Sequence, residues 1–281
     1  MLPFVFERIS EVQVWISNQR EIYGSVIGFV PTMGALHPGH ISLINKAKET
    51  CDIVVVSIFV NPTQFNNPED LEHYPKTFER DRAMLAEAEC DAIFFPSVEE
   101  MYPTQEKGHW DFGLLSSTLE GQFRPGHFDG VLTVVKKLFQ IVKPDKAFFG
   151  EKDFQQLSLI RKMTAHEGLP VDVIGSKLIR EMDGLAMSSR NMRLNEQERQ
   201  KATEISKGLF AMRDFDRNAS PKALIQFGKN QLEKASIPVE YLSIVEADTF
   251  IPVNEWETSQ RPIALLAAYV GKVRLIDNMF L

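Results

Sequence analysis

The sequence is poor in cysteine, with only Cys51 and Cys90 among 281 residues. Two thiols in so long a chain do not form a disulfide framework, so we expect both to be buried in a protein kept in a reducing compartment. Long apolar runs are also missing, because the longest, around IVVVSIFV and PIALLAAYV, have the length of strands rather than of membrane spans. Glu7 and Arg8 interrupt the region in which a signal peptide needs its apolar core. These absences predict a soluble, cytoplasmic protein.

Basic charge is scarce as well. The 31 Lys and Arg residues against 38 Asp and Glu residues give a formal net charge of −7. Nucleic acids and anionic membranes are bound through basic surfaces, so this balance argues against both as partners. Two phosphate-binding patterns are missing too, since the sequence contains neither G-x-x-x-x-G-K-[ST] nor G-x-G-x-x-G. Their absence excludes a P-loop and the usual dinucleotide-binding turn.

The composition that remains is that of an ordinary globular chain, with 44% hydrophobic and 25% charged residues. Its length predicts one large domain and one smaller one. Strand-like and helix-like stretches alternate through the first two-thirds, and this order predicts an α/β fold with a Rossmann-like, doubly wound parallel sheet covered on both faces. The expected strands are Ser25–Val30, Ile53–Val60, Ala92–Phe95, Lys146–Phe149 and Val171–Ile174, and the expected helices are 38–50, Phe78–Glu89, Val131–Val142 and Phe154–His166.

The pattern changes after Asp183-Gly184. Asn195, with Glu198 three residues later, is typical of a helix N-cap, and Ser220-Pro221 offers a second cap. Two strand-like runs follow, Val239–Ala247 and Ile263–Leu275. We therefore predict a small α+β domain after the large one, with the boundary near residue 178.

The first chemical motif is PTMGALHPGH, residues 31–40, directly after the first expected strand. Gly34 and Gly39 allow tight turns and a close approach of the backbone to a ligand. Pro38 suits the first turn of a helix, whose free N–H groups attract an anion. His37 and His40 are three residues apart, so both imidazoles can lie on one face of that turn. The motif predicts a site that binds phosphates and stabilises the charge that develops as pyrophosphate leaves.

The second motif is Asn61-Pro62-Thr63-Gln64-Phe65, at the carboxyl end of the next expected strand. This edge borders the crevice in which open α/β sheets bind ligands. Gln64 offers a donor and an acceptor, which suits a substrate with both a hydroxyl and a carboxylate. An ordinary turn is the alternative interpretation, because Asn-Pro is common in turns.

Two further motifs carry cations and hydroxyl groups. Gly150-Glu151-Lys152-Asp153 follows the strand that ends at Phe149, and Lys152 suits phosphate oxygens while Asp153 can cap the next helix. Met187-Ser188-Ser189-Arg190-Asn191 follows the Asp-Gly turn, and Arg190 can bind a phosphate with two hydrogen bonds. A solvated polar loop is the alternative for the last motif. The four motifs together predict a nucleotide-phosphate enzyme.

Seven segments closely resemble the pantothenate synthetase (pantoate–β-alanine ligase) family. They are PTMGALHPGH, FVNPTQF, DLEHYPKT, LEGQFRPGHFDGV, FFGEKDFQQL, DGLAMSSRN and RLIDN, and they span residues 31–278 in the family's order. The family belongs to the nucleotidyltransferase superfamily whose first motif ends in paired histidines. The resemblance implies an AMP-forming ligase that condenses (R)-pantoate with β-alanine through a pantoyl-adenylate, in the biosynthesis of pantothenate and coenzyme A.

The resemblance also implies the site residues. His40, His37 and Lys152 would be catalytic, with His40 in the proton-donor position. Gln64 and Gln156 would bind pantoate, with Gln64 near β-alanine as well. At position 179, Ile179 replaces the family's usual valine and would contact adenine through its main chain. ATP would be held by Met33, Gly34, Ala35, Leu36, His37, Pro38, Gly39, His40, Gly150, Glu151, Lys152, Asp153, Ile179, Met187, Ser188, Ser189 and Arg190.

The family further implies ATP as a substrate, Mg²⁺, and a homodimer as the assembled state. It implies a domain of residues 1–178 that binds ATP and pantoate and a domain of residues 179–281 that closes over the active site. Three other functions stay open from the residues alone: another nucleotidylyltransferase of the superfamily, an ATP-binding module without turnover, and a zinc hydrolase using His37 and His40. No third zinc ligand is evident in the sequence, so no metal-binding residue is assigned.

Overall fold

The computed structural model describes residues 2–104, 108–216 and 218–281. The chain divides into two compact units. The first unit comprises Met1–Glu151 and Gln155–Lys177, and the second comprises Lys152–Phe154 and Leu178–Leu281. In the described residues, no helix combines the length and the apolar character that crossing a membrane requires.

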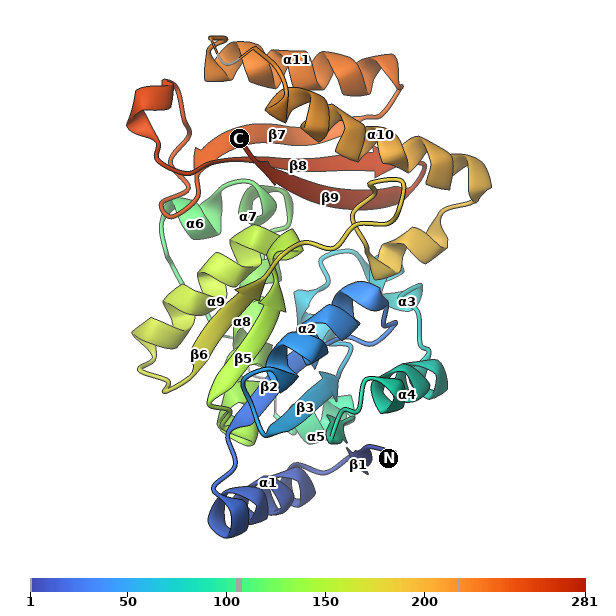
Figure 1. Cartoon of the computed structure of the whole chain (residues 1–281), viewed down its shortest axis with the longest axis vertical. Coiled ribbons are helices and arrows are strands. Elements are labelled where there is room, and N and C mark those ends of the chain that lie inside the picture. Colours follow the sequence, from blue (N-terminus) through green and yellow to red (C-terminus); the bar gives the residue numbers. More distant parts are fainter. Residues whose placement is uncertain (1, 105–107, 217) are drawn as a thin grey trace. The chain divides into compact units, whose positions relative to one another are not determined.

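A six-stranded sheet forms the centre of the first unit, in the order β1-β4-β3-β2-β5-β6 (Figure 1). Each neighbouring pair of strands is parallel, and the central strand β2 pairs with β3 through Phe29 and Val55 and with β5 through Phe29 and Ala147. The strands are β1 (Phe4–Phe6), β2 (Ile27–Thr32), β3 (Ile53–Ile58), β4 (Ala92–Phe94), β5 (Lys146–Gly150) and β6 (Asp172–Ser176).

Helices cover both faces of this sheet. On one face, Leu43 of α2 (Pro38–Lys48) and Leu85 of α4 (Phe78–Glu87) pack in one core cluster with Val56 of β3. On the other face, the Phe139 ring of α8 (His127–Val142) lies 6.4 Å from Phe29 and 6.3 Å from Phe149, between ring centroids. This doubly wound arrangement confirms the predicted fold class, and the apolar strands explain it, because both of their faces are buried.

The remaining elements of the first unit include some that the sequence did not predict. Strand β1 and helix α1 (Ile9–Tyr23) precede the first expected strand. Helix α8 begins at His127 rather than at Val131, because Gly130, which resembles a turn residue, lies inside the helix against the backbone of Thr63. The other elements of the first unit are η1 (Pro62–Gln64), α3 (Pro68–Glu72), α5 (Val98–Met101), α6 (Leu114–Ser117) and α7 (Glu120–Phe123). Residues of both units occur in η2 (Glu151–Asp153) and in α9 (Phe154–His166).

In the second unit, two helices cover one face of an antiparallel sheet of order β7-β8-β9 (Figure 1). Leu209 and Leu232 of these helices pack with Leu266 of the central strand. Asn195 and Glu198 form the predicted capping box, and Ser220 caps the second helix through its side chain. The elements are η3 (Ser189–Arg193), α10 (Glu196–Arg213), α11 (Pro221–Lys234), β7 (Val239–Glu246), η4 (Trp256–Thr258), β8 (Pro262–Val270) and β9 (Val273–Phe280).

One predicted strand is wrong. Ile263–Leu275 is not continuous but turns at Gly271-Lys272, where Val270 pairs with Val273. Val270 and Val273 on the two sides of the turn are both buried, so apolar residues resume directly after it. Gly271 adopts a φ of 57°, which a tight reversal needs. The hairpin leaves Asp277 and Asn278 inside β9.

The two cysteines differ from each other. Cys90 is 3% exposed, and burial raises the pKa of its thiol to about 12. Cys51 is only partly buried, because it lies in the turn between α2 and β3, so the prediction that both thiols are buried is wrong for this residue.

Candidate active site

His37 and His40 lie together at the start of α2. Pro38 occupies the first turn of the helix, and His37 stands before it in an extended conformation. The Nδ1 atom of His40 accepts a hydrogen bond from the backbone N–H of His37 at 3.3 Å. The two imidazole rings lie 4.1 Å apart between centroids. The spacing of the two histidines predicted this pairing, whereas their catalytic role stays a prediction.

Side chains of the first unit hold the loop between β2 and α2 by accepting hydrogen bonds from its backbone N–H groups. The carboxylate of Asp81 accepts the N–H groups of Ala35 and Leu36, each at 2.8 Å. The hydroxyl of Thr32 accepts the N–H of Gly34 at 3.1 Å. Gly34 has a φ of 76°, and a Cβ atom there would lie 3.0 Å from the Asp81 carboxylate. This part of the motif therefore shapes the loop that leads to the histidines.

Asp81 is 1% exposed, and the sequence did not predict its role. A signal was present, because Asp81 lies on the same helical stripe as Phe78 and Leu85, where an apolar residue is expected. A buried carboxylate needs hydrogen-bond donors, and here backbone amides supply them. The ATP contacts expected of Gly34, Ala35 and Leu36 stay predictions.

Gln64 ends η1, the first element after β3. Its Oε1 atom accepts a hydrogen bond from the buried amide of Asn61 at 3.1 Å, and its Nε2 atom lies 3.0 Å from the Met33 sulfur. The Asn61 amide also donates to the backbone oxygen of Gly130 at 3.1 Å, which ties the turn to α8. Met33 and Gln64, predicted to bind different substrates, are thus brought together.

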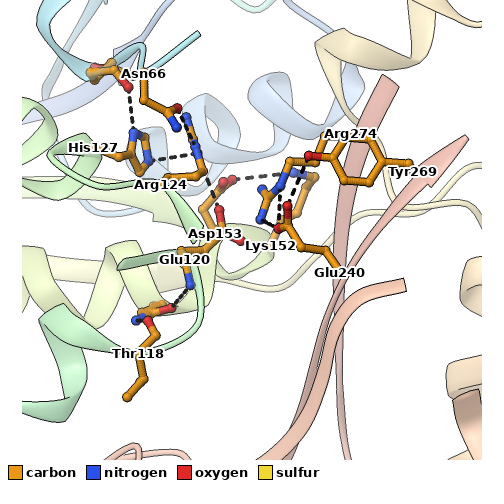
Figure 2. Close-up of polar contacts among 12 residues, drawn as sticks. Asn66, Thr118, Glu120, Arg124, His127, Lys152, Asp153, Glu240, Tyr269 and Arg274 are labelled. Carbon is orange, nitrogen blue, oxygen red and sulfur yellow. Dashed lines mark hydrogen bonds and ion pairs between the residues drawn. The ribbon is translucent and has the colours of Figure 1, made fainter. Parts of the chain in front are cut away.

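A second group of side chains supports Gln64, as Figure 2 shows: Glu120 of α7, Arg124 directly after α7, His127 of α8 and Asn66 after η1. The Nδ1 atom of His127 lies 2.8 Å from the Gln64 backbone oxygen, which can only accept, so Nδ1 carries the proton. The Nε2 atom then accepts from the Arg124 guanidinium at 3.0 Å, and Arg124 lies 3.4 Å from the Glu120 carboxylate. The sequence did not predict this network, although Glu120, Arg124 and His127 all lie in the LEGQFRPGHFDGV segment.

The loop after β5 provides the next predicted residues. Strand order reverses between β2 and β5, which makes the carboxyl ends of these strands the switch point at which such sheets bind ligands. Gly150 ends β5, and a Cβ atom there would meet nothing within 4 Å. Glu151 follows it in η2. The loops after β2 and β5 thus start from adjacent strands.

Two adjacent glutamines in α9 have different surroundings. Gln155 is buried, donates to the backbone oxygens of Leu115 and Thr118 at 2.9 Å each, and accepts the N–H of Glu120 at 3.2 Å. Gln156 is half-buried. Gln155 therefore serves the fold, and pantoate binding by Gln156 stays a prediction.

The second unit carries the other predicted ATP-binding residues. The Lys152 ammonium lies 3.7 Å from the Asp153 carboxylate, and the Asp153 side chain is 47% exposed. Ile179 and Met187 face each other in a short ribbon, where the Met187 N–H donates to the Ile179 oxygen at 3.0 Å. Ser188 then caps η3 by accepting the N–H of Arg190 at 3.3 Å, and Ser189 begins that turn.

The predicted residues therefore form two local sets. The first unit holds residues 33–40, Gln64, Gly150, Glu151 and Gln156, and the second holds Lys152, Asp153, Ile179 and residues 187–190. Binding of one nucleotide by both sets stays a prediction. Among the residues that the structure describes, no three His, Cys, Asp or Glu side chains form a group that could hold a metal ion.

A doubly wound sheet with a glycine-bearing turn and paired imidazoles at its switch point defines a Rossmann-like protein of the nucleotide-binding class. The family model for pantoate-beta-alanine ligase matches residues 4–280, and the chain belongs to this family.

Relatives and solved structures agree with this membership. Pantothenate synthetase from Porphyromonas gingivalis is 46% identical over 276 residues, which is 98% of each chain. The one from Fervidobacterium nodosum is 48% identical over 261 residues, 92% of each chain. Among crystal structures, pantothenate synthetase from Thermus thermophilus has a TM-score of 0.92 at 40% identity and 98% coverage of both chains. Pantoate-beta-alanine ligase from Francisella tularensis, complexed with beta-gamma ATP and beta-alanine, has a TM-score of 0.84 at 37% identity, covering 99% of this chain and 97% of its own.

Proposed function

We propose that this protein condenses (R)-pantoate with β-alanine at the expense of ATP, and so forms pantothenate, AMP and pyrophosphate. One observation carries the proposal at the level of chemistry: the imidazoles of His37 and His40 lie 4.1 Å apart at the start of α2, beside the switch point of the sheet. A helix start with two imidazoles suits the stabilisation of a phosphate leaving group. The family match over residues 4–280 supports the identity of the acid and the amine.

The reaction proceeds in two steps because a carboxylate is a poor acceptor for an amine. In the first, a pantoate carboxylate oxygen attacks the α-phosphorus of ATP, and the bond to the β-phosphate oxygen breaks to release pyrophosphate. In the second, the β-alanine amine attacks the carbonyl of the adenylate, loses a proton, and expels AMP. No side chain forms a covalent bond, since positioning and electrostatics can supply the rate.

The protein's residues bind and orient these groups. His40 and His37 neutralise charge on the departing pyrophosphate, and His40 donates a proton to it. Lys152 and Arg190 hold phosphate oxygens, together with the hydroxyls of Ser188 and Ser189. The main chain at Ile179 contacts adenine. Gln64 and Gln156 bind pantoate, and the contacts of Gln64 with Asn61 and Met33 support this role by holding its amide in the turn that follows β3.

Magnesium belongs to this proposal as the partner of ATP. Mg²⁺ is bound through one or two carboxylates and substrate phosphates rather than by a cage of protein ligands. The exposed carboxylate of Asp153, beside the Lys152 ammonium, fits such a place. When bound there, the ion would reduce the negative charge of the triphosphate.

We also propose a cytoplasmic homodimer. Large apolar side chains are exposed near the start of the first unit, including Phe4 at 56%, Ile22 at 67% and Tyr23 at 71%. Exposed apolar side chains of this size are available to a protein interface. Light scattering on the purified protein, which should give twice the mass of the chain, tests the assembly.

An omission experiment tests the activity. The protein is incubated with Mg·ATP, pantoate and β-alanine, each omitted in turn, and pyrophosphate and AMP are assayed separately. Multiple-turnover release of both products should need all three substrates. AMP transfer that does not depend on an amine would indicate another nucleotidylyltransferase instead, and ATP binding without any product would indicate a binding module. Activity that zinc-selective chelators abolish would indicate the zinc hydrolase.

A further inference from the structure

Two adjacent residues of β9, Asp277 and Asn278, have no role in the proposed reaction. Asp277 is 3% exposed and stands on the side of β9 from which Val273 and Leu275 enter the core of the second unit. A carboxylate in an apolar stripe is costly unless it is paired and hydrogen-bonded. Its partners therefore indicate what the residue is for.

Arg180 is the partner of Asp277. Its two terminal nitrogens donate to the two carboxylate oxygens at 2.7 and 2.8 Å. This bidentate ion pair fixes both the distance and the orientation of the two side chains. The same nitrogens donate to the backbone oxygens of Gly184 at 3.0 Å and Asn278 at 3.1 Å. The guanidinium also lies over the Phe210 ring, 5.1 Å from its centroid. Arg180 is thereby held in one orientation.

Arg180 belongs to the ribbon that carries two predicted ATP-binding positions. It bridges to Ala186, next to the bond between the Met187 N–H and the Ile179 oxygen. Its guanidinium also donates to the Gly184 oxygen at the tip, so Arg180 holds the paired part of the ribbon through its backbone and the turn through its side chain. The chain then passes directly into Ser188 and the η3 turn.

Asn278 holds the other ATP-binding segment of the second unit. Its side-chain amide donates to the backbone oxygen of Lys152 at 3.0 Å. Two neighbouring residues of one strand therefore hold two segments that are far apart in sequence: the backbone at Lys152 and the ribbon of residues 179–187.

We propose that Asp277 and Asn278 are positioning residues for ATP, which set the backbone at Lys152 and the Ile179–Met187 ribbon in register with each other. Neither residue needs to touch the nucleotide. The inference rests on the proposed function, which assigns Lys152, Ile179 and Met187 to ATP. A displacement of about 1 Å in such groups can lower a rate about a hundredfold, so the spacing of the two segments matters for binding and turnover.

The alternative is that the buried ion pair contributes stability alone, and the two roles can be separated. Removing one partner leaves the other charge buried and unpaired, whereas replacing both by apolar side chains of similar size often restores stability. The double variant Arg180→Met/Asp277→Leu removes both charges and the bidentate geometry. Arg180→Lys keeps the positive charge but cannot form the bidentate pair of hydrogen bonds. Asn278→Ala removes only the hydrogen bond to Lys152.

Each variant is measured in three ways: urea unfolding, the KM values for ATP and pantoate, and the dissociation constant of α,β-methylene-ATP by calorimetry. We expect the double variant to unfold near the wild-type midpoint, yet to bind the ATP analogue about tenfold more weakly or worse. Arg180→Lys and Asn278→Ala should weaken ATP binding in the same direction, with the KM for pantoate changed by about twofold or less. Asp248→Asn/Arg261→Met, which removes a surface ion pair of the same unit, serves as the control.

A double variant with both stability and ATP affinity restored would overturn the proposal, and so would wild-type ATP affinity in Asn278→Ala. If the double variant does not fold, Arg180→Lys decides the question. Wild-type ATP affinity in Arg180→Lys would overturn the proposal, because it would show that a positive charge suffices without the bidentate geometry. The wild-type protein separates this test from the proposed function. If it binds the ATP analogue but makes no AMP from pantoate and β-alanine, the reaction assignment is wrong, while the binding constants still decide the role of Asp277 and Asn278.

Discussion

The carboxylate of Asp81 accepts the backbone N–H of Leu36 at 2.8 Å, although the two residues are 45 positions apart in sequence. The second carboxylate oxygen accepts the neighbouring N–H of Ala35 at the same distance, and the Thr77 hydroxyl donates to the carboxylate at 3.1 Å. This acid holds the loop that ends at His37. The placement of the paired histidines therefore depends on a residue of α4.

Asp81→Asn tests this dependence. An amide presents only one acceptor oxygen, so one of the two backbone N–H groups would lose its partner in a buried place. We expect a loss of about 1–3 kcal/mol in the free energy of unfolding, and a higher KM for ATP. Urea unfolding and steady-state kinetics measure the two effects. Glu79→Gln, at an exposed position of the same helix, is the control, and equal stability of the two variants would contradict the assignment.

His40→Ala should retain the fold and lose most activity. The side chain is only half-buried at the helix start, so its removal should leave the circular dichroism and the unfolding midpoint close to wild type. Loss of a group that stabilises the leaving pyrophosphate should lower kcat by about 10²–10³-fold. His109→Ala, whose side chain is 82% exposed, is the matched control. Near-normal turnover of the His40 variant would reject its catalytic role.

Gly130→Ala should disturb pantoate binding from a distance. A Cβ atom at this position of α8 would lie 2.4 Å from the Thr63 backbone oxygen and 2.7 Å from the Gln64 Cα atom. Because both neighbours are backbone, the turn that carries Gln64 must move, and we expect the KM for pantoate to rise about tenfold or more. Steady-state kinetics with each substrate varied measures this rise.

Gly208→Ala provides the control for that substitution, since it also lies inside a helix. Its Cβ atom would meet Leu232 at an ordinary 3.4 Å, and alanine favours the helix by about 1 kcal/mol. We expect unchanged kinetics and equal or higher stability. A Gly130 variant with the kinetics of the Gly208 variant would show that the close approach to Thr63 has no bearing on pantoate.

The sequence predicted those features that depend on local chemistry. Helix α9 has the predicted bounds, Phe154–His166, and the capping box at Asn195 is confirmed. Apart from β1, the strands of the parallel sheet were predicted to within about two residues at each end, since their apolar runs reflect burial on both faces. The neighbouring imidazoles of His37 and His40 follow from helical spacing alone.

The features that escaped prediction depend on partners far away in the chain. Asp81 receives amides from residues 35 and 36, and Asp277 receives Arg180 across 97 positions. Gly130 resembles a turn residue until the backbone of Thr63 is seen against it. The β8–β9 hairpin was not predicted because apolar residues stand directly on both sides of the two-residue turn at Gly271-Lys272. A single sequence shows that a polar residue or a glycine stands at an unexpected position, but it does not show the distant residue with which it interacts.

Glu246 supplies a prediction for pH. Its Oε2 atom accepts the hydroxyl of Ser259 at 2.6 Å and the N–H groups of Gln260 and Arg261 at 2.9 and 3.1 Å. These hydrogen bonds, that of Ser259 foremost, lower the pKa of Glu246 in the folded protein. An acid with a lowered folded pKa stabilises the fold above its unfolded pKa, about 4.3 for glutamate, and this contribution is lost as the pH falls through the folded value.

Glu246→Gln should therefore be less stable than wild type at pH 7, and the difference should shrink as the pH falls from about 5 to below 4. Urea unfolding of both proteins at pH 7, 5, 4 and 3.5 gives this difference. Glu257→Gln, which removes an exposed carboxylate from the same loop, controls for the change in net charge. A stability difference that stays constant or grows on acidification would mean that the ionised carboxylate does not hold the loop of residues 259–261, because only that form accepts all three hydrogen bonds without repelling a donor.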